Sequence, residues 1–110
     1  MLFRSALASS PFVPPAPDDV DRGELRELVR RGDVVEVEGI FYAASAIEEA
    51  ARLAARLLDN DPEGFTVSAF REAAGNTRKH AMPLLSHLDG TGVTRRRDDV
   101  RIAGPRLPNT

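Results

Sequence analysis

The chain contains no cysteine, which excludes disulfide bonds, thiolate zinc sites and cysteine nucleophiles. It also has no apolar run long enough to cross a membrane. The first ten residues are too short and too broken for a signal peptide or anchor. We therefore expect a soluble, cytoplasmic protein with no membrane partner. Its 110 residues suffice for one ordinary domain or two very small ones.

The chemistry of an enzyme is missing as well. No Gly-x-x-x-x-Gly-Lys-[Ser/Thr] loop occurs, so we expect this polypeptide to lack a nucleotide-binding domain. No nucleophile stands in a pattern with a general base. His87 has no acidic or histidine partner at ligand spacing, and we expect it on the surface rather than at a metal. These absences predict a binding module without catalytic residues, metal or cofactor of its own.

Charge, by contrast, is strongly segregated along the chain. Residues 1–70 carry seven arginines against thirteen acidic residues, a net charge of −6, within a chain whose total is −2. Residues 71–101 carry seven basic residues against four acidic ones, a net charge of +3. Such asymmetry is the expected footprint of local polyanion binding. A merely solvated basic face explains the charge equally well.

The first half of the chain predicts an arm, a helix and a hairpin. Residues 9–20 hold four prolines and predict a linker or an extended arm. A helix is expected after Asp19 or Asp21 and ends at Gly32. β-Branched and aromatic residues around Glu38-Gly39 predict a hairpin of residues 34–37 and 40–42.

Three further helices and a second hairpin are expected. Ser45 and Glu48 form a capping box that predicts the start of a long helix. Residues 67–74 predict a brief helix, and Asn76 or Thr77 precedes a third helix that ends near Gly90 or Gly92. The last hairpin comprises residues 93–96 and 100–102.

Pro83 lies inside the third of these helices, where a proline removes a hydrogen-bond donor. We therefore expect residues 77–80 to be held loosely, with amides and cations free to meet an anion. A kink set by packing is the alternative interpretation.

An internal repeat supports this division. A shift of sixty residues superposes helix, glycine stop and hairpin: Leu25 on Leu85, Leu28 on Leu88, Gly32 on Gly92, Ile40 on Val100, Tyr42 on Ile102 and Ala43 on Ala103. Three helices followed by a hairpin make a winged helix, a helix-turn-helix variant with a two-stranded wing. The predicted fold class is thus α+β, mainly helical. Its parts are a Pro-rich arm or linker (1–20), a partial winged helix with only the last helix and wing (21–44), a complete winged helix (45–105) and a tail (106–110).

Three stretches carry a family pattern: residues 65–71, residues 76–89 with Thr-Arg-Lys-His and Pro-Leu-Leu-Ser, and residues 92–101 with Gly-Val-Thr-Arg-Arg-Arg-Asp-Asp-Val-Arg. They resemble the last winged-helix domain of the bacterial selenocysteine-specific elongation factor. The resemblance covers residues 65–105 closely, and residues 12–58 resemble the preceding winged helix more loosely. The sequence departs from the pattern at His80, Ser86 and Asp98, where the family has an aromatic residue, glutamate and glycine.

The resemblance implies a function in translation. The family is a translational GTPase whose C-terminal winged helices bind an mRNA stem-loop, the selenocysteine insertion (SECIS) element, which directs selenocysteine to an in-frame UGA codon. It implies that this chain is the RNA-binding end only, a fragment or a separately encoded tail, and we expect a monomer. The mRNA hairpin would be its partner, with the ribosome and selenocysteinyl-tRNA reached through the parent GTPase.

The expected RNA contacts are cations and polar groups near the third helix and the wing: Arg71, Asn76, Thr77, Arg78, Lys79, His80, Arg95, Arg97 and Arg101. Arginine offers a planar fork to phosphate, whereas lysine acts as a point charge. Arg95 and Arg97 share one face of a strand and Arg96 points the other way, so we expect one face to touch RNA and the other to pair with local carboxylates, with the choice of face left open. Surface ion pairs are the alternative for each arginine.

Two other functions remain open at this point. One is a DNA-binding winged helix of a transcriptional regulator, although Pro83, Ser86 and His87 offer few base contacts. The other is a protein-interaction winged helix, which the acidic first half of the chain favours. A salt titration with hairpin RNA, duplex DNA and unstructured RNA would separate the three.

Overall fold

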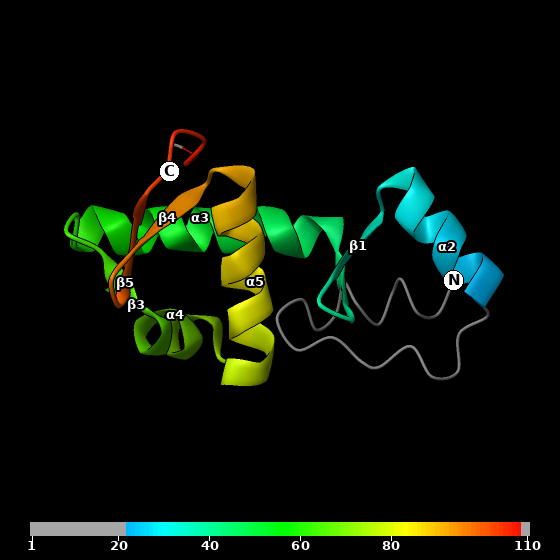
Figure 1. The fold of residues 1–110 in the computed structure, drawn as a ribbon, viewed down its shortest axis with the longest axis horizontal. Coiled ribbons are helices and arrows are strands. Elements are labelled where there is room, and N and C mark those ends of the chain that lie inside the picture. Colours follow the sequence, from blue (N-terminus) through cyan, green and yellow to red (C-terminus); the bar gives the residue numbers. More distant parts are fainter. Residues whose placement is uncertain (1–21, 109–110) are drawn as a thin grey trace.

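The computed structural model describes residues 22–108, so the predicted arm of residues 1–20 lies outside the described part (Figure 1). The order of elements confirms the predicted mainly helical α+β fold. They are α2 (Arg22–Arg31), β1 (Val34–Val37), β2 (Ile40–Ala43), α3 (Ala44–Asn60), β3 (Phe65–Thr66), α4 (Val67–Ala74), α5 (Arg78–Thr91), β4 (Thr94–Arg97) and β5 (Val100–Ala103).

The first helix and hairpin form as the sequence predicts. α2 ends where Gly32 takes a left-handed φ of 81°, a conformation that glycine adopts without strain. β1 and β2 then pair antiparallel around the two-residue turn Glu38-Gly39. Leu28 is buried on α2, whereas Val29 is 38% exposed because it turns away from the body of the molecule.

The junction between the first hairpin and α3 has no linker. β2 ends at Ala43 and α3 begins at Ala44, whose N–H donates to the carbonyl of Asp33 at 2.9 Å. The predicted capping box is therefore wrong: Ser45 lies exposed within the helix, and the N-cap residue Ala43 makes no side-chain cap. The bond to Asp33 satisfies one of the unpaired N–H groups at the start of the helix, which a capping side chain would otherwise do.

α4 is capped by Thr66, the last residue of β3. The Thr66 hydroxyl accepts the N–H of Ala69 at 3.0 Å, a normal N-cap interaction. Phe65 and Thr66 also pair with β5, which makes the wing a three-stranded sheet in the order β3-β5-β4. The wing is thereby attached to the start of α4.

α5 begins at Arg78 after Thr77, and Pro83 lies at its sixth residue. The amides of His80 and Ala81 both bond to the Thr77 carbonyl, at 3.1 and 2.9 Å. The helix continues through the proline to Thr91. Pro83 itself is buried, so its ring contributes to packing.

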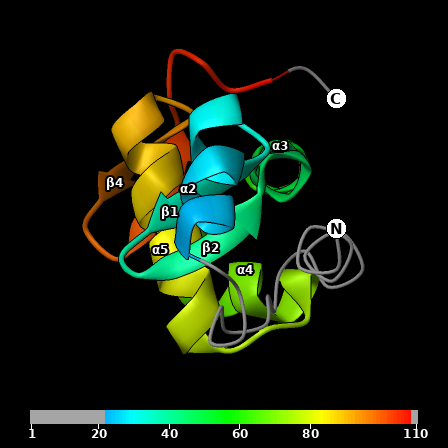
Figure 2. The ribbon, with the colours of Figure 1, turned by 90° about the vertical axis from the view of Figure 1, so that its right-hand side faces the viewer.

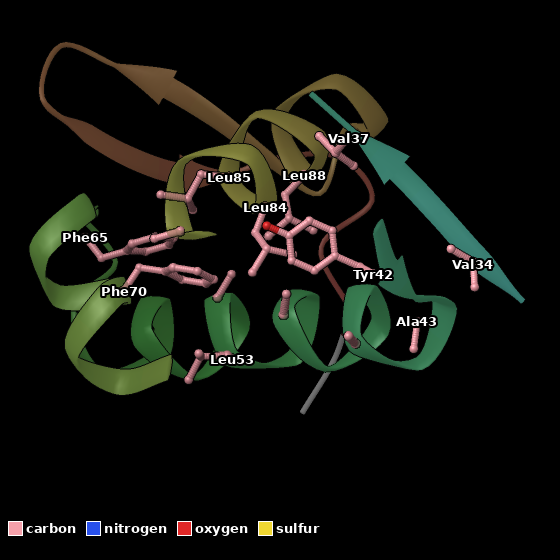
Figure 3. Close-up of a cluster of buried hydrophobic side chains, with 14 of the residues drawn as sticks. Val34, Val37, Tyr42, Ala43, Leu53, Phe65, Phe70, Leu84, Leu85 and Leu88 are labelled. Carbon is pink, nitrogen blue, oxygen red and sulfur yellow. The ribbon is translucent and has the colours of Figure 1, made fainter. Parts of the chain in front are cut away.

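One hydrophobic cluster joins α2, β1, β2, α3, β3, α4 and α5 (Figure 3). Tyr42 from β2 and Leu28 from α2 share it with Phe70 of α4 and with the leucines of α5. α3 has the first hairpin at one end and β3 at the other, and α2 lies beyond the hairpin (Figure 1). Seen from the α2 side, α2 and the first hairpin lie in front of α5 (Figure 2).

Candidate nucleic-acid interface

The start of α5 presents two cations to solvent. Arg78 and Lys79 are both exposed. Within residues 22–108, neither side chain forms an ion pair. Thr77, just before them, is exposed as well, and its hydroxyl lies 3.4 Å from His80 Nδ1. The helix start thus offers two exposed cations, whereas the expectation of free amides is wrong for His80, whose N–H bonds to the Thr77 carbonyl.

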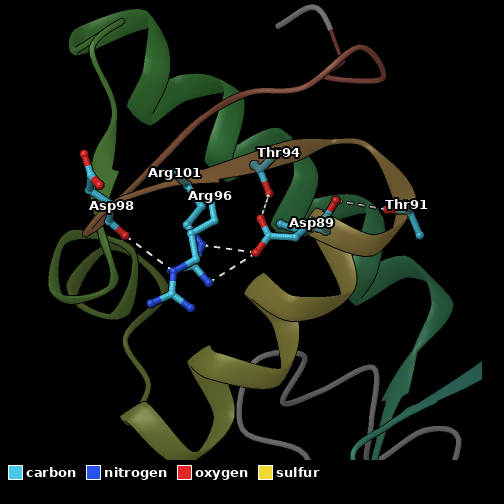
Figure 4. Close-up of polar contacts among 7 residues, drawn as sticks. Asp89, Thr91, Thr94, Arg96, Asp98 and Arg101 are labelled. Atoms are coloured by element: carbon cyan, nitrogen blue, oxygen red, sulfur yellow. Dashed lines mark hydrogen bonds and ion pairs between the residues drawn. The ribbon is translucent and has the colours of Figure 1, made fainter.

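A buried polar network fixes the wing to the end of α5 (Figure 4). Asp89 Oδ1 accepts from the Thr94 hydroxyl at 2.6 Å. Its Oδ2 accepts from Arg101 Nε and Nη2 at 3.3 and 3.2 Å. Arg101 is only 4% exposed. The carboxylate of Asp89 is therefore the internal counterion of the wing.

This network corrects the assignment of Arg101 as an RNA contact. A guanidinium that is buried and doubly bonded to a carboxylate holds the fold together and is not presented to a phosphate. Sequence reasoning missed the pairing because the two residues are twelve positions apart and come from different elements. The one sequence signal for this pairing was the Leu88-Asp89 pair near the end of the predicted third helix.

The wing turns Arg96 toward α5. In the hairpin register Arg96 lies opposite Arg101, on the face where Thr94 meets Asp89. Its Nε donates to the Asp98 carbonyl at 3.4 Å (Figure 4). Arg96 and Arg78 line one cleft of about 260 Å³, together with Thr66, Val67, Ser68, Met82, Asp98, Asp99 and Arg101. We call this space the α5–wing cleft.

Arg95 and Arg97 lie on the opposite face of the wing. They pair with Ile102 and Val100 across the hairpin. Arg97 borders an outer hollow shared with Pro62 and Glu63. The hydrogen bond of Arg96 goes to a backbone carbonyl rather than to a carboxylate. Arg96, rather than Arg95 or Arg97, lies beside Arg78.

The remaining predicted residues differ in accessibility. Arg71 is half-buried on α4. Asn76 is only 8% exposed, and its N–H bonds to the Arg71 carbonyl at 3.2 Å. Asn76 therefore helps shape the turn between α4 and α5 instead of offering its side chain to a ligand.

His80 is half-buried one residue after Lys79. Burial, and then the charge of Lys79, lower its pKa below the usual 6.5. The ring is accordingly neutral at neutral pH, so it can stack on a base or accept a hydrogen bond.

Within residues 22–108, no group of three histidine or acidic residues could hold a metal ion. None of the helices in this part is long and apolar enough to cross a membrane.

Comparison with known proteins agrees with this geometry. The family model described as elongation factor SelB, winged helix, matches residues 56–103. The mRNA-binding domain of elongation factor SelB from E. coli, solved in complex with SECIS RNA, is 30% identical with a TM-score of 0.66. That match covers 76% of this chain and 69% of the E. coli domain. No curated protein matches the chain in sequence.

A second solved structure shares the fold. The bacterial selenocysteine-specific elongation factor EF-Sec has a TM-score of 0.73 and 19% identity. The match covers 92% of this chain but only 18% of that factor, so it concerns a small part of a much larger protein. With a relative 30% identical over more than two thirds of its length, the chain belongs to the winged-helix family of elongation factor SelB.

Proposed function

We propose that this chain is the RNA-binding module of a selenocysteine-specific elongation factor, and that it binds an mRNA stem-loop of the SECIS type. Binding would direct selenocysteine to a UGA codon. The ribosome and selenocysteinyl-tRNA would be met through a GTPase that the chain does not contain. The E. coli relative supports the choice of ligand, because it was solved with such an RNA.

One observation carries the proposal: cations from two elements lie around a single cleft. Arg78 from α5 and Arg96 from β4 line the α5–wing cleft, and Lys79 is exposed next to Arg78. The first residues of α4 line it too, and the N-terminal end of a helix carries a partial positive charge. An A-form stem hides its major-groove edges, so phosphates and unpaired bases are the groups that such a surface can reach.

The acidic side chains of the cleft limit how the RNA approaches. Asp98 and Asp99 lie at the tip of the wing, where they would repel a phosphate. The RNA backbone should therefore run along the α5 side of the cleft, over Arg78 and Lys79, and meet the wing at Arg96.

A salt titration of the whole chain tests this proposal. A stem-loop RNA, a duplex DNA and an unstructured RNA are compared, and the SECIS-type hairpin should bind most tightly. Three to five phosphate contacts predict a slope of log affinity against log salt of about −2 to −4. Equal affinity for all three ligands would contradict hairpin recognition, and tighter binding of duplex DNA would favour the transcriptional-regulator alternative.

Charge reversal provides the matched pair of variants. Lys79→Glu should weaken hairpin binding roughly 100-fold, because a charge-assisted contact is replaced by repulsion, while the fold stays intact. Arg52→Glu makes the same charge change on α3, where Arg52 is exposed and away from the cleft. Similar losses in both variants would show that only the total charge matters.

A further inference from the structure

Tyr42, in the first hairpin, reaches the start of α5. Its side chain is 0% exposed and lies in the core beside Leu84 (Figure 3). Its hydroxyl donates to the backbone carbonyl of His80 at 2.8 Å. A residue of the first repeat thus bonds to the turn that carries Arg78 and Lys79 in the second.

The first turn of α5 lacks one bond of the helical ladder. Because Pro83 has no N–H, the carbonyl of Lys79 has no helical donor four residues later. The ring of a helical proline also crowds this carbonyl. The next carbonyl, that of His80, is the one that the Tyr42 hydroxyl binds. The tyrosine therefore adds a bond one residue after the position that lacks its helical donor.

The hydroxyl of Tyr42 has no counterpart in the second repeat. The residue at the same register position there is Ile102, which is half-buried and lies outside the hydrophobic cluster. Burial raises the pKa of Tyr42, so the hydroxyl remains protonated and able to donate. A buried hydroxyl needs a hydrogen-bond partner, and that of Tyr42 has one in the His80 carbonyl.

We propose that Tyr42 is a positioning residue for RNA binding: its hydrogen bond to the His80 carbonyl holds the first turn of α5 so that Arg78 and Lys79 face the RNA. This inference rests on the proposed function. It makes the first repeat part of the RNA-binding apparatus without any contact between Tyr42 and the ligand.

The test removes only the hydroxyl, with Tyr42→Phe in the full chain. Hairpin affinity should fall about fivefold, the effect expected for one lost hydrogen bond. Hydrogen exchange should become faster at the amides of His80 and Ala81, which bond to the Thr77 carbonyl. Leu53→Val is the control, since Leu53 is buried on α3 and the variant keeps the hydroxyl. At equal global stability, the control should bind hairpin like the parent chain.

A double variant separates positioning from general destabilisation. In a background with both Arg78→Ala and Lys79→Ala, Tyr42→Phe should cost much less affinity, because both groups that it positions are gone. Full additivity, or unchanged binding by Tyr42→Phe alone, would overturn the inference. If the parent chain binds no hairpin, the proposed function fails, and the exchange rates of His80 and Ala81 alone then decide whether Tyr42 holds the turn.

Discussion

The helix and hairpin of residues 22–43, here the first unit, share a backbone plan with those of residues 78–103, the second unit. Each helix ends at a left-handed glycine, with φ of 81° at Gly32 and 86° at Gly92. The next residue then donates back to the helix at 3.1 Å in the first unit and 3.0 Å in the second. Both hairpins pair in the same register around a two-residue turn.

The two units differ in the chemistry placed on that plan. Where the second unit has Asp89, Thr94 and Arg101, the first has three apolar residues: Val29, Val34 and Phe41. The first unit faces the shared core with its hairpin, whereas the second places a buried ion pair behind a basic edge. Glycines and turns thus set the backbone geometry, and three substituted side chains separate an apolar hairpin from one held by a buried ion pair.

The largest expected effect on stability comes from removing Asp89, the carboxylate that bonds to Thr94 and Arg101. Asp89→Ala should lower the free energy of unfolding by about 3 kcal/mol, because the Arg101 guanidinium stays buried without its carboxylate. Chemical denaturation of the full chain measures the change.

The control installs the first unit's residues in the second. Asp89→Val, Thr94→Val and Arg101→Phe together should recover most of the stability, since a packed apolar set often equals a buried ion pair. A triple variant as unstable as Asp89→Ala would show that the two units are not interchangeable.

The next largest expected effect is the difference in RNA affinity between variants on the two faces of the β4–β5 hairpin. Arg96→Ala should weaken hairpin binding about tenfold and reduce the salt slope by about 0.7 to 0.9. Arg97→Ala, on the outer face, should have a much smaller effect. Glu36→Arg adds a cation at the equivalent site of the first unit and should leave affinity nearly unchanged. Losses of equal size for Arg96 and Arg97 would contradict the placement of RNA in the α5–wing cleft.

The hairpin turns offer a finer comparison. Glu38 and Asp98 both have positive φ, 52° and 55°, which side chains rarely adopt. Glu38→Asn creates the Asn-Gly pair that such turns favour and should stabilise the chain by about 0.5–1 kcal/mol. Asp98→Asn should gain less, because aspartate already tolerates this region. It should also tighten RNA binding by removing a negative charge, which a hairpin titration would detect.

The smallest effect concerns pH. Because the pKa of His80 is lower in the folded chain than its usual 6.5, the unfolded chain binds more protons just below that value. Stability should therefore fall as pH drops below about 6.5 and level off once the folded chain is protonated too. His80→Asn should remove this part of the pH dependence in thermal unfolding, whereas His87→Asn should retain it.

Much of the fold follows from local signals, and the site follows only in part. Glycine stops, turn residues and the sixty-residue repeat predict the elements near their observed bounds. The exposure of Arg78 and Lys79 follows from their place in the first turn of α5, ahead of its buried apolar residues. The orientation of the wing does not, because Val100 and Ile102 suggest one buried face while Asp89 buries Arg101 on the other. A tertiary ion pair decided which arginine lies beside α5.

The direct passage from β2 into α3 has a mechanical consequence. With Ala44 bonded to the Asp33 carbonyl, no linker residue separates the first hairpin from α3. The first hairpin and α3 should therefore move together as one rigid element.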